Sequence, residues 1–169
     1  MASMRRSVIV SILFGVFGGP GIVLVYLPLW ITHFHIPAGV PWWQVVVAAA
    51  LIVVGVAPGF ESARRFVFVG QGTLMPTEPT EHLVVSGFYR YVRNPMYVGV
   101  LGALAGEAVL FERRAMVVYS AVVWLVIHLF VFFYEEPTLI RRYGEEYLRF
   151  KRHVPRWLPR MTAWQGSEQ

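Results

Sequence analysis

Two groups of polar residues stand at the edges of the last two apolar segments of this 169-residue chain. The first is the stretch RYVRNPMY, residues 90–97, and the second is the pair Glu135 and Glu136. Asn94 followed by Pro95 is typical of a helix start, where Asn caps, Pro occupies the first turn and backbone N–H groups stay open to a ligand. Carboxylates attract cations. Together these residues predict a polar pocket for a ligand that carries positive charge and hydrogen-bonding groups.

Helix geometry predicts that these two groups lie at the same level. Arg113 marks the short charged stretch between the two apolar segments, with Asn94 19 residues before it and Glu135 22 residues after it. At a rise of about 1.5 Å per residue, both side chains lie roughly 30 Å from the turn. A tight helical hairpin would therefore bring Asn94 and Glu135 near each other.

Four apolar segments are available to position these groups: residues 7–30, 42–60, 96–111 and 115–134. A helix needs roughly 20 apolar residues to cross the bilayer core. Charged residues make up only 15% of the chain, against about 25% in soluble proteins. We therefore expect an all-α, multi-pass membrane protein of about four transmembrane helices, in one domain of residues 1–169.

The distribution of basic residues predicts the orientation in the membrane. Of the 15 Lys and Arg residues, all but Arg113 and Arg114 fall at the termini or between the second and third segments. By the positive-inside rule both termini are cytoplasmic, and we expect a bacterial inner membrane. Anionic lipid headgroups explain the basic tail, so no nucleic-acid partner is expected.

The C-terminal tail has the pattern of an amphipathic helix. Its apolar residues recur at intervals of three to four: Leu139, Tyr143, Tyr147, Phe150 and Val154. Pro137 suits the first turn of this cytoplasmic helix, and Pro155 ends it. The helix is expected to lie on the bilayer, to cover a cytoplasmic site, or to do both.

Other chemistries have weaker support in the sequence. The chain has no Cys, which excludes thiolate catalysis. His33 and His35 do not share a helical face, so we expect no metal site at these two residues. Glu107, inside the third segment, is expected to be structural, bonded to a helix neighbour or to Arg113 or Arg114. His128 is expected to pack between helices.

The motifs "LVVSGFYRYVRNPMYVG" and "EEPTLIRRYGEEYLRFKRHVPRWLP" resemble the isoprenylcysteine carboxyl methyltransferase family, its bacterial relatives and the related phospholipid methyltransferases. The shared pattern is Gly-x-Tyr-Arg-x-x-Arg-(His/Asn)-Pro-x-Tyr, a Glu pair after the last span, and a Gly-Glu-Glu-Tyr tail that ends in Val-Pro. The resemblance covers roughly residues 83–159, and the first two spans are compatible with it.

The resemblance implies S-adenosylmethionine as the cofactor, bound on the cytoplasmic side by segments 82–98 and 135–159. The implied contacts to the adenosyl group come from His82, Leu83, Val84, Gly87 and Tyr89. Arg93, Asn94, Tyr97 and Val98 would hold the cofactor from the third helix, and Glu135 and Glu136 would take its ribose or amino group. Arg93, Asn94 and Glu136 are the candidate catalytic residues, and no metal is implied.

The methyl acceptor stays open at this point. The stretch "LFVFFYEE" lacks the basic residues that would pair with a carboxylate, and Asn94 stands where many relatives have His. The implied partners are membrane lipids and a lipophilic or lipidated acceptor that offers an amine, carboxylate, hydroxyl or thiol. Two alternatives are a sterol-reductase-like enzyme that binds NADPH and a non-enzymatic membrane scaffold.

Overall fold

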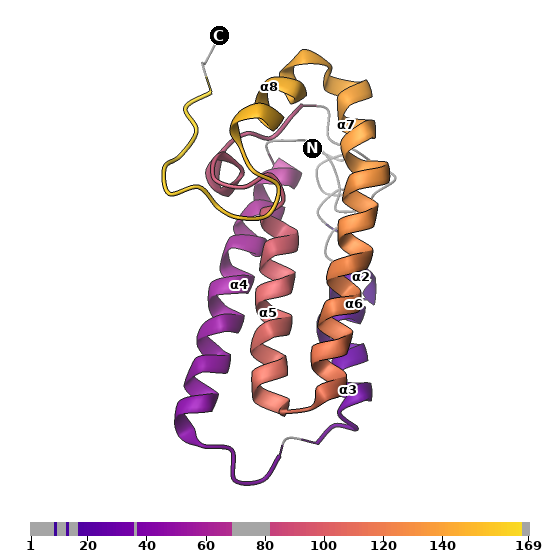
Figure 1. Ribbon diagram of the computed structural model, residues 1–169, viewed down its shortest axis with the longest axis vertical. Coiled ribbons are helices and arrows are strands. Elements are labelled where there is room, and N and C mark those ends of the chain that lie inside the picture. The colour runs from indigo at the N-terminus through magenta and orange to yellow at the C-terminus, as the bar shows by residue number, and fades with distance from the viewer. Residues whose placement is uncertain (1–8, 10–12, 14–16, 36, 69–81, 167–169) are drawn as a thin grey trace.

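The described part of the chain is built of helices. The structure is a computed structural model that describes residues 9, 13, 17–35, 37–68 and 82–166. Figure 1 shows three of its helices standing side by side: α4 (Trp42–Phe68), α5 (Pro95–Phe111) and α6 (Arg114–Phe130). No strand occurs in these residues, so the all-α prediction is confirmed there.

A shorter helical segment lies beside α6 in Figure 1. It consists of α2 (Gly19–Gly21), the π-helix η1 (Ile22–Tyr26) and α3 (Leu27–Ile31). The Tyr119 hydroxyl of α6 donates a hydrogen bond of 2.8 Å to the Val23 carbonyl and ties the two segments together. In the first predicted segment, residues 7–30, residues 7, 8, 10–12 and 14–16 lie outside the described part of the chain.

Within the described residues, two helical runs are long and apolar enough to cross a bilayer: Trp42–Arg65 and Arg114–Tyr143. The second run joins α6, the π-helix η3 (Val131–Glu135) and α7 (Glu136–Tyr143) without a break. Two further apolar helices, Gly19–Ile31 and Pro95–Phe111, are shorter. The helix α4 extends beyond the second apolar segment, residues 42–60, and continues through Pro58 to Phe68.

Small residues let α4 and α5 pack with their backbones nearly in contact. A methyl group at Gly55 would lie 2.7 Å from the Gly99 carbonyl oxygen, and one at Gly99 would lie 2.6 Å from the Gly55 oxygen. This is the small-residue packing that drives helix association in membranes. At the other end of α4, Gln44 donates a 2.7 Å hydrogen bond to the Val109 carbonyl near the end of α5.

The tail folds into two helices instead of the single helix predicted. After α7 the chain turns at Gly144, whose φ of +53° favours glycine, and α8 (Glu145–His153) begins. The apolar face of the tail packs on the segment that precedes α5. The buried residues of this core are Val84, Tyr89, Tyr147, Phe150 and Val154.

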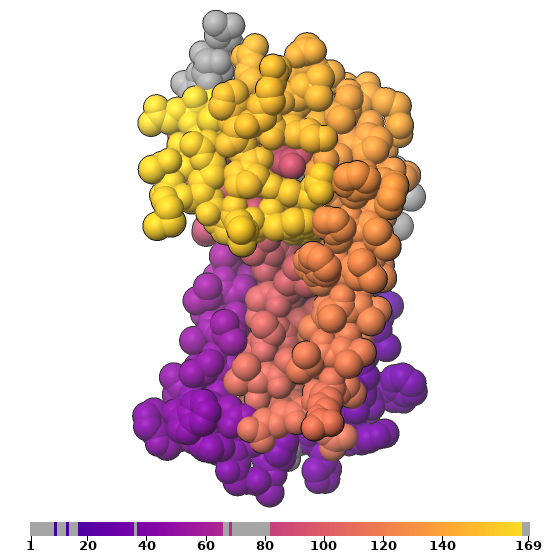
Figure 2. Space-filling model, viewed as in Figure 1, coloured from indigo at the N-terminus to yellow at the C-terminus, as the bar shows by residue number. Residues whose placement is uncertain are grey.

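The C-terminal strap, residues 155–164, runs along the segment that leads into α5. The amide of Arg93 donates to the Pro155 carbonyl, that of Arg160 to the Tyr91 carbonyl, and that of Trp164 to the Arg90 carbonyl, each at 2.9 Å. In Figure 2 the yellow C-terminal atoms cover most of the magenta segment at this end of the molecule. Both predicted motif regions therefore lie in one compact head at the end of the helices.

Candidate functional site

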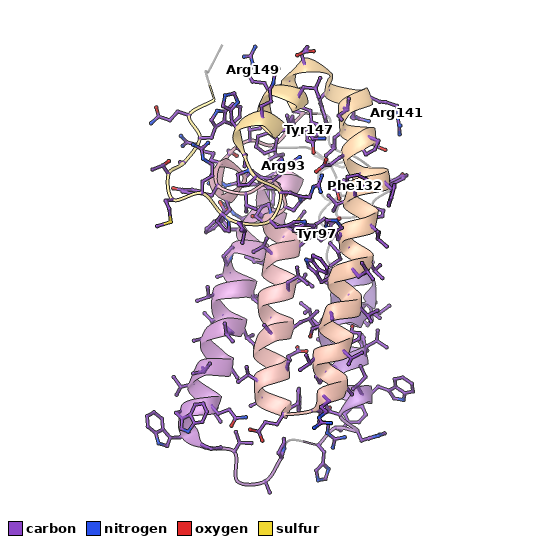
Figure 3. The ribbon with its side chains drawn as sticks, in the orientation of Figure 1. Arg93, Tyr97, Phe132, Arg141, Tyr147 and Arg149 are labelled. Carbon is purple, nitrogen blue, oxygen red and sulfur yellow. The ribbon has the colours of Figure 1, made fainter. Side chains whose placement is uncertain are left out.

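A pocket of about 60 Å³ lies in this head, where α5 begins and η3 ends. Its walls come from the segment before α5 with the 3₁₀ helix η2 (Gly87–Arg90), the first turn of α5, η3, and the two tail helices. Figure 3 shows Arg93, Tyr97 and Tyr147 in this region, whereas Arg141 and Arg149 lie at its periphery. The lining residues are Leu83, Val84, Tyr89, Arg93, Asn94, Met96, Tyr97, Glu135, Leu139, Tyr147 and Phe150.

Glu135 supplies the carboxylate of the pocket. It is the last residue of the π-helix η3, a distortion that is frequent at functional sites. The Tyr97 hydroxyl donates a hydrogen bond of 3.1 Å to Glu135 Oε2. No ion pair to Glu135 is found among the residues that the structure describes, so this half-buried carboxylate has no protein cation to balance it.

Glu136, the next residue, is instead surrounded by cations. It is 3% exposed and contacts Arg93 at 2.9 Å and Lys151 at 3.0 Å. Arg156 binds both of its oxygens, at 2.5 and 2.9 Å, and this hydrogen bonding raises the pKa of the Arg156 guanidinium. Glu136 thus joins α7, α8 and the strap to the start of α5, and it does not line the pocket.

Arg93 and Asn94 line the pocket and are hydrogen-bonded to the residues that surround it, Arg93 to Glu136 and Asn94 to the strap. Arg93 Nη1 donates to Glu136 and, at 3.4 Å, to the Tyr147 hydroxyl, while its buried Nε has no partner within the described ranges. Asn94 occupies the N-cap position of α5, but its side chain makes no capping bond. The amide instead donates a 3.1 Å hydrogen bond to the Arg156 carbonyl of the strap, because the strap passes over the helix start.

Two buried phenols add hydrogen-bond donors to the pocket wall. Burial, followed by the charges of Glu135 and Glu61, raises the pKa of Tyr89. Burial raises the pKa of Tyr147 to about 12. Both hydroxyls therefore stay protonated at neutral pH. The Tyr89 hydroxyl has no hydrogen-bond partner in the described part of the chain, which leaves it available to a ligand.

Seven of the predicted site residues line the pocket, and four do not. His82, Gly87, Val98 and Glu136 lie outside the lining. Gly87 has a φ of +60°, a left-handed conformation that favours glycine, and it packs against the side chain of Arg65. Four lining residues were not predicted as site residues from the sequence: Met96, Leu139, Tyr147 and Phe150. The last three belong to the apolar pattern of the tail, and that pattern is the sequence signal that could have identified them.

Glu107 of α5 and His128 of α6 lie outside the pocket. His128 Nδ1 accepts a 3.1 Å hydrogen bond from Trp157 of the strap, and its ring stacks on Trp124. Glu107 Oε2 is buried and has no partner in the described structure, and the expected ion pairs with Arg113 or Arg114 are not among those found there. No group of three potential metal ligands occurs in the part of the chain that the structure describes.

Counting only contacts among the described residues, the site combines a carboxylate without an ion pair, phenol and guanidinium donors without hydrogen-bond partners, and apolar walls. It lies at one end of a set of helices of membrane-spanning type. Such a protein is suited to bind a small ligand that carries a cationic group and hydrogen-bond acceptors beside the bilayer. Residues 43–146, more than half of the chain, match the phospholipid methyltransferase family. The chain therefore belongs to this family.

Curated relatives give a second comparison. Over 86 residues the chain is 38% identical to the protein-S-isoprenylcysteine O-methyltransferases of Mus musculus and Rattus norvegicus, and 37% identical to that of Homo sapiens. The alignments cover 47% of this chain and 28% of each relative. The matched stretch therefore spans little more than a quarter of the relatives' length.

Proposed function

We propose that this protein transfers a methyl group from S-adenosylmethionine to a lipophilic acceptor in the membrane. The observation that carries the proposal is the half-buried Glu135 carboxylate, which faces the pocket, accepts a hydrogen bond from Tyr97 and has no ion pair with any residue that the structure describes. A sulfonium cofactor with a free ammonium group supplies the missing positive charge. Family membership supports the same reaction.

The pocket residues fit this cofactor chemically. Glu135 suits the ammonium group. The Tyr89 hydroxyl and Arg93 Nε, which have no hydrogen-bond partner in the described part of the chain, suit carboxylate or ribose oxygens. Leu83, Val84 and Phe150 give apolar surface for the adenine ring. The bound cofactor would supply an electrophilic methyl group. Binding contacts from His82, Gly87 and Val98 stay part of the proposal, although these residues lie outside the pocket lining.

The contribution of the chain to the reaction is mainly positioning. Holding the acceptor in line with the methyl group can supply about 7–11 kcal/mol of barrier reduction. Arg93 and Asn94 are at the pocket and fixed by neighbours, Arg93 by Glu136 and Asn94 by the strap. We therefore propose that Arg93 and Asn94 contact the ligands, and that Glu136 holds Arg93 in place.

The membrane arrangement is part of the same proposal. We infer four spans, with both termini and the head on the cytoplasmic side of a bacterial inner membrane, and one domain for the whole chain. The tail helices α7 and α8 act as the amphipathic cover of the pocket. Phe132, Phe133 and Tyr134, which directly precede Glu135, are 49%, 71% and 52% exposed, which supports entry of a lipid-borne acceptor from the bilayer.

Transfer of a labelled methyl group tests the proposal. The protein is reconstituted in vesicles of bacterial lipid extract and incubated with S-adenosylmethionine that carries a radioactive methyl group. We expect label in the organic phase with the wild type and far less with Glu135→Gln. Oxidation of NADPH by the vesicles without any labelled lipid would support the reductase alternative and contradict the proposal.

A further inference from the structure

The C-terminal strap presents two apolar residues on the surface of the head. Leu158 is 80% exposed and Met161 is 98% exposed, more than any other large apolar residue in the described part of the chain. Neither of them belongs to the buried core of the head or to the pocket lining. Since single exposed apolar residues are common in proteins, their meaning depends on what lies beside the strap.

The strap lies against the apolar helical run that contains α6. Trp157 Nε1 donates a hydrogen bond of 3.1 Å to His128 Nδ1, and the centroids of the two rings are 5.9 Å apart. The Arg156 guanidinium lies over the Phe132 ring, 5.3 Å from its centroid. Because residues 128 and 132 are one helical turn apart, they share a face of this run, and the strap follows that face.

The contact with His128 lies closer to the middle of the apolar run than the pocket does. His128 precedes Glu135 by seven residues within the run Arg114–Tyr143, which corresponds to roughly 10 Å along the helix. Trp124 and Val126, which are 44% and 59% exposed, give α6 an apolar surface at this level. In Figure 1 the yellow strap turns back at the level of the first turns of α5. The strap therefore reaches the apolar part of the helices.

The backbone of the strap suits a shallow position in a bilayer, where unpaired polar groups are costly. Pro155 and Pro159 have no N–H group. The amide of Arg160 donates to the Tyr91 carbonyl at 2.9 Å, and the Arg156 carbonyl accepts a side-chain amide at 3.1 Å. Arg156 and Arg160 also flank the exposed apolar residues, and long basic side chains of this kind reach from apolar surface to the lipid headgroups.

We propose that the strap tip, residues 157–161, is a membrane anchor whose Leu158 and Met161 side chains insert at the boundary between the lipid headgroups and the acyl chains. The inference rests on the part of the proposed function that places α6 across the bilayer, and it adds a re-entrant contact to the spans. Because the strap also bonds to Asn94 and Glu136, this insertion attaches one side of the pocket to the lipid surface.

Fluorescent labelling of single cysteines tests this inference, since the chain has no Cys of its own. Leu158→Cys and Met161→Cys of the full-length protein are each labelled with the dye NBD and reconstituted in vesicles of phosphatidylcholine and phosphatidylglycerol. Two quenchers are compared: a lipid with a nitroxide near the carboxyl end of an acyl chain, and iodide present on both sides of the membrane. At both positions we expect quenching by the nitroxide lipid and loss of quenching by iodide.

Two further positions serve as matched controls. Val126→Cys, on α6 near His128, should be quenched by the nitroxide lipid and protected from iodide, whereas Glu146→Cys, exposed on α8, should show the opposite pattern. If iodide quenches either strap variant as strongly as Glu146→Cys while Val126→Cys stays protected, this inference alone is overturned. If iodide also quenches Val126→Cys to that extent, the proposed span of α6 fails with it.

Discussion

Glu135 and Glu136 are adjacent in the sequence, yet their carboxylates have opposite surroundings. Glu136 is 3% exposed and contacts Arg93, Lys151 and Arg156. Glu135 faces the pocket and accepts one hydrogen bond, from Tyr97, within the described residues. Glu136 therefore ties the elements of the head together, whereas Glu135 is the carboxylate that we propose binds the ligand.

Glu136→Gln should loosen the head. The substitution leaves Arg93, whose side chain is 8% exposed, without its carboxylate, and breaking a buried pair in this way costs about 3–5 kcal/mol. Thermal unfolding in detergent and limited proteolysis of the strap measure the effect. Glu145→Gln is the control, since the ion pair of Glu145 with Arg152 is exposed and is worth about 1 kcal/mol at most. Equal losses in the two variants would contradict the structural role of Glu136.

Asn94→Ala should release part of the strap. It removes the hydrogen bond to the Arg156 carbonyl, worth about 1 kcal/mol, and it removes a side chain from the pocket wall. We expect faster hydrogen exchange at the amides of Arg160 and Trp164, which donate to the segment before α5, together with weaker binding of S-adenosylhomocysteine. Unchanged exchange at both amides would show that Asn94 does not secure the strap.

The two glycines on α4 should respond differently to the same added methyl group. Gly55→Ala places it 2.7 Å from the Gly99 carbonyl oxygen, and overpacking of this kind costs about 1–3 kcal/mol. At Gly59, one helical turn away, the nearest atoms would be 3.8 Å distant, so Gly59→Ala should be neutral or stabilising by up to about 1 kcal/mol. Melting temperatures in detergent measure both changes. A larger loss in Gly59→Ala would contradict the close contact of α4 with α5.

The meeting of the two polar motifs was predictable from the sequence. Counting residues from Arg113 placed Asn94 and Glu135 at one level. In the structure α5 ends at Phe111 and α6 begins at Arg114, and the Tyr97 hydroxyl donates to Glu135 at 3.1 Å. The count succeeds because helical rise is nearly constant, and because a turn of two residues makes the two helices antiparallel neighbours.

Features that depend on side-chain direction were not predictable in this way. The different partners of Glu135 and Glu136 follow from the π-helix η3 and from the path of the strap, and no local sequence pattern fixes either of them. The break at Gly144 was missed because the apolar spacing continues across it.

Thermal unfolding of the detergent-solubilised wild type and of Glu135→Gln, each with S-adenosylhomocysteine or NADPH, tests the central claim most directly. A ligand at 100 times its dissociation constant stabilises the folded state by about 2.7 kcal/mol. We predict that S-adenosylhomocysteine stabilises the wild type and that NADPH has no effect. Glu135→Gln should lose most of the stabilisation by S-adenosylhomocysteine, although without ligand it should melt at the same temperature as the wild type. Stabilisation of the wild type by NADPH alone, or an equal gain from S-adenosylhomocysteine in both proteins, would contradict a cofactor pocket built around Glu135.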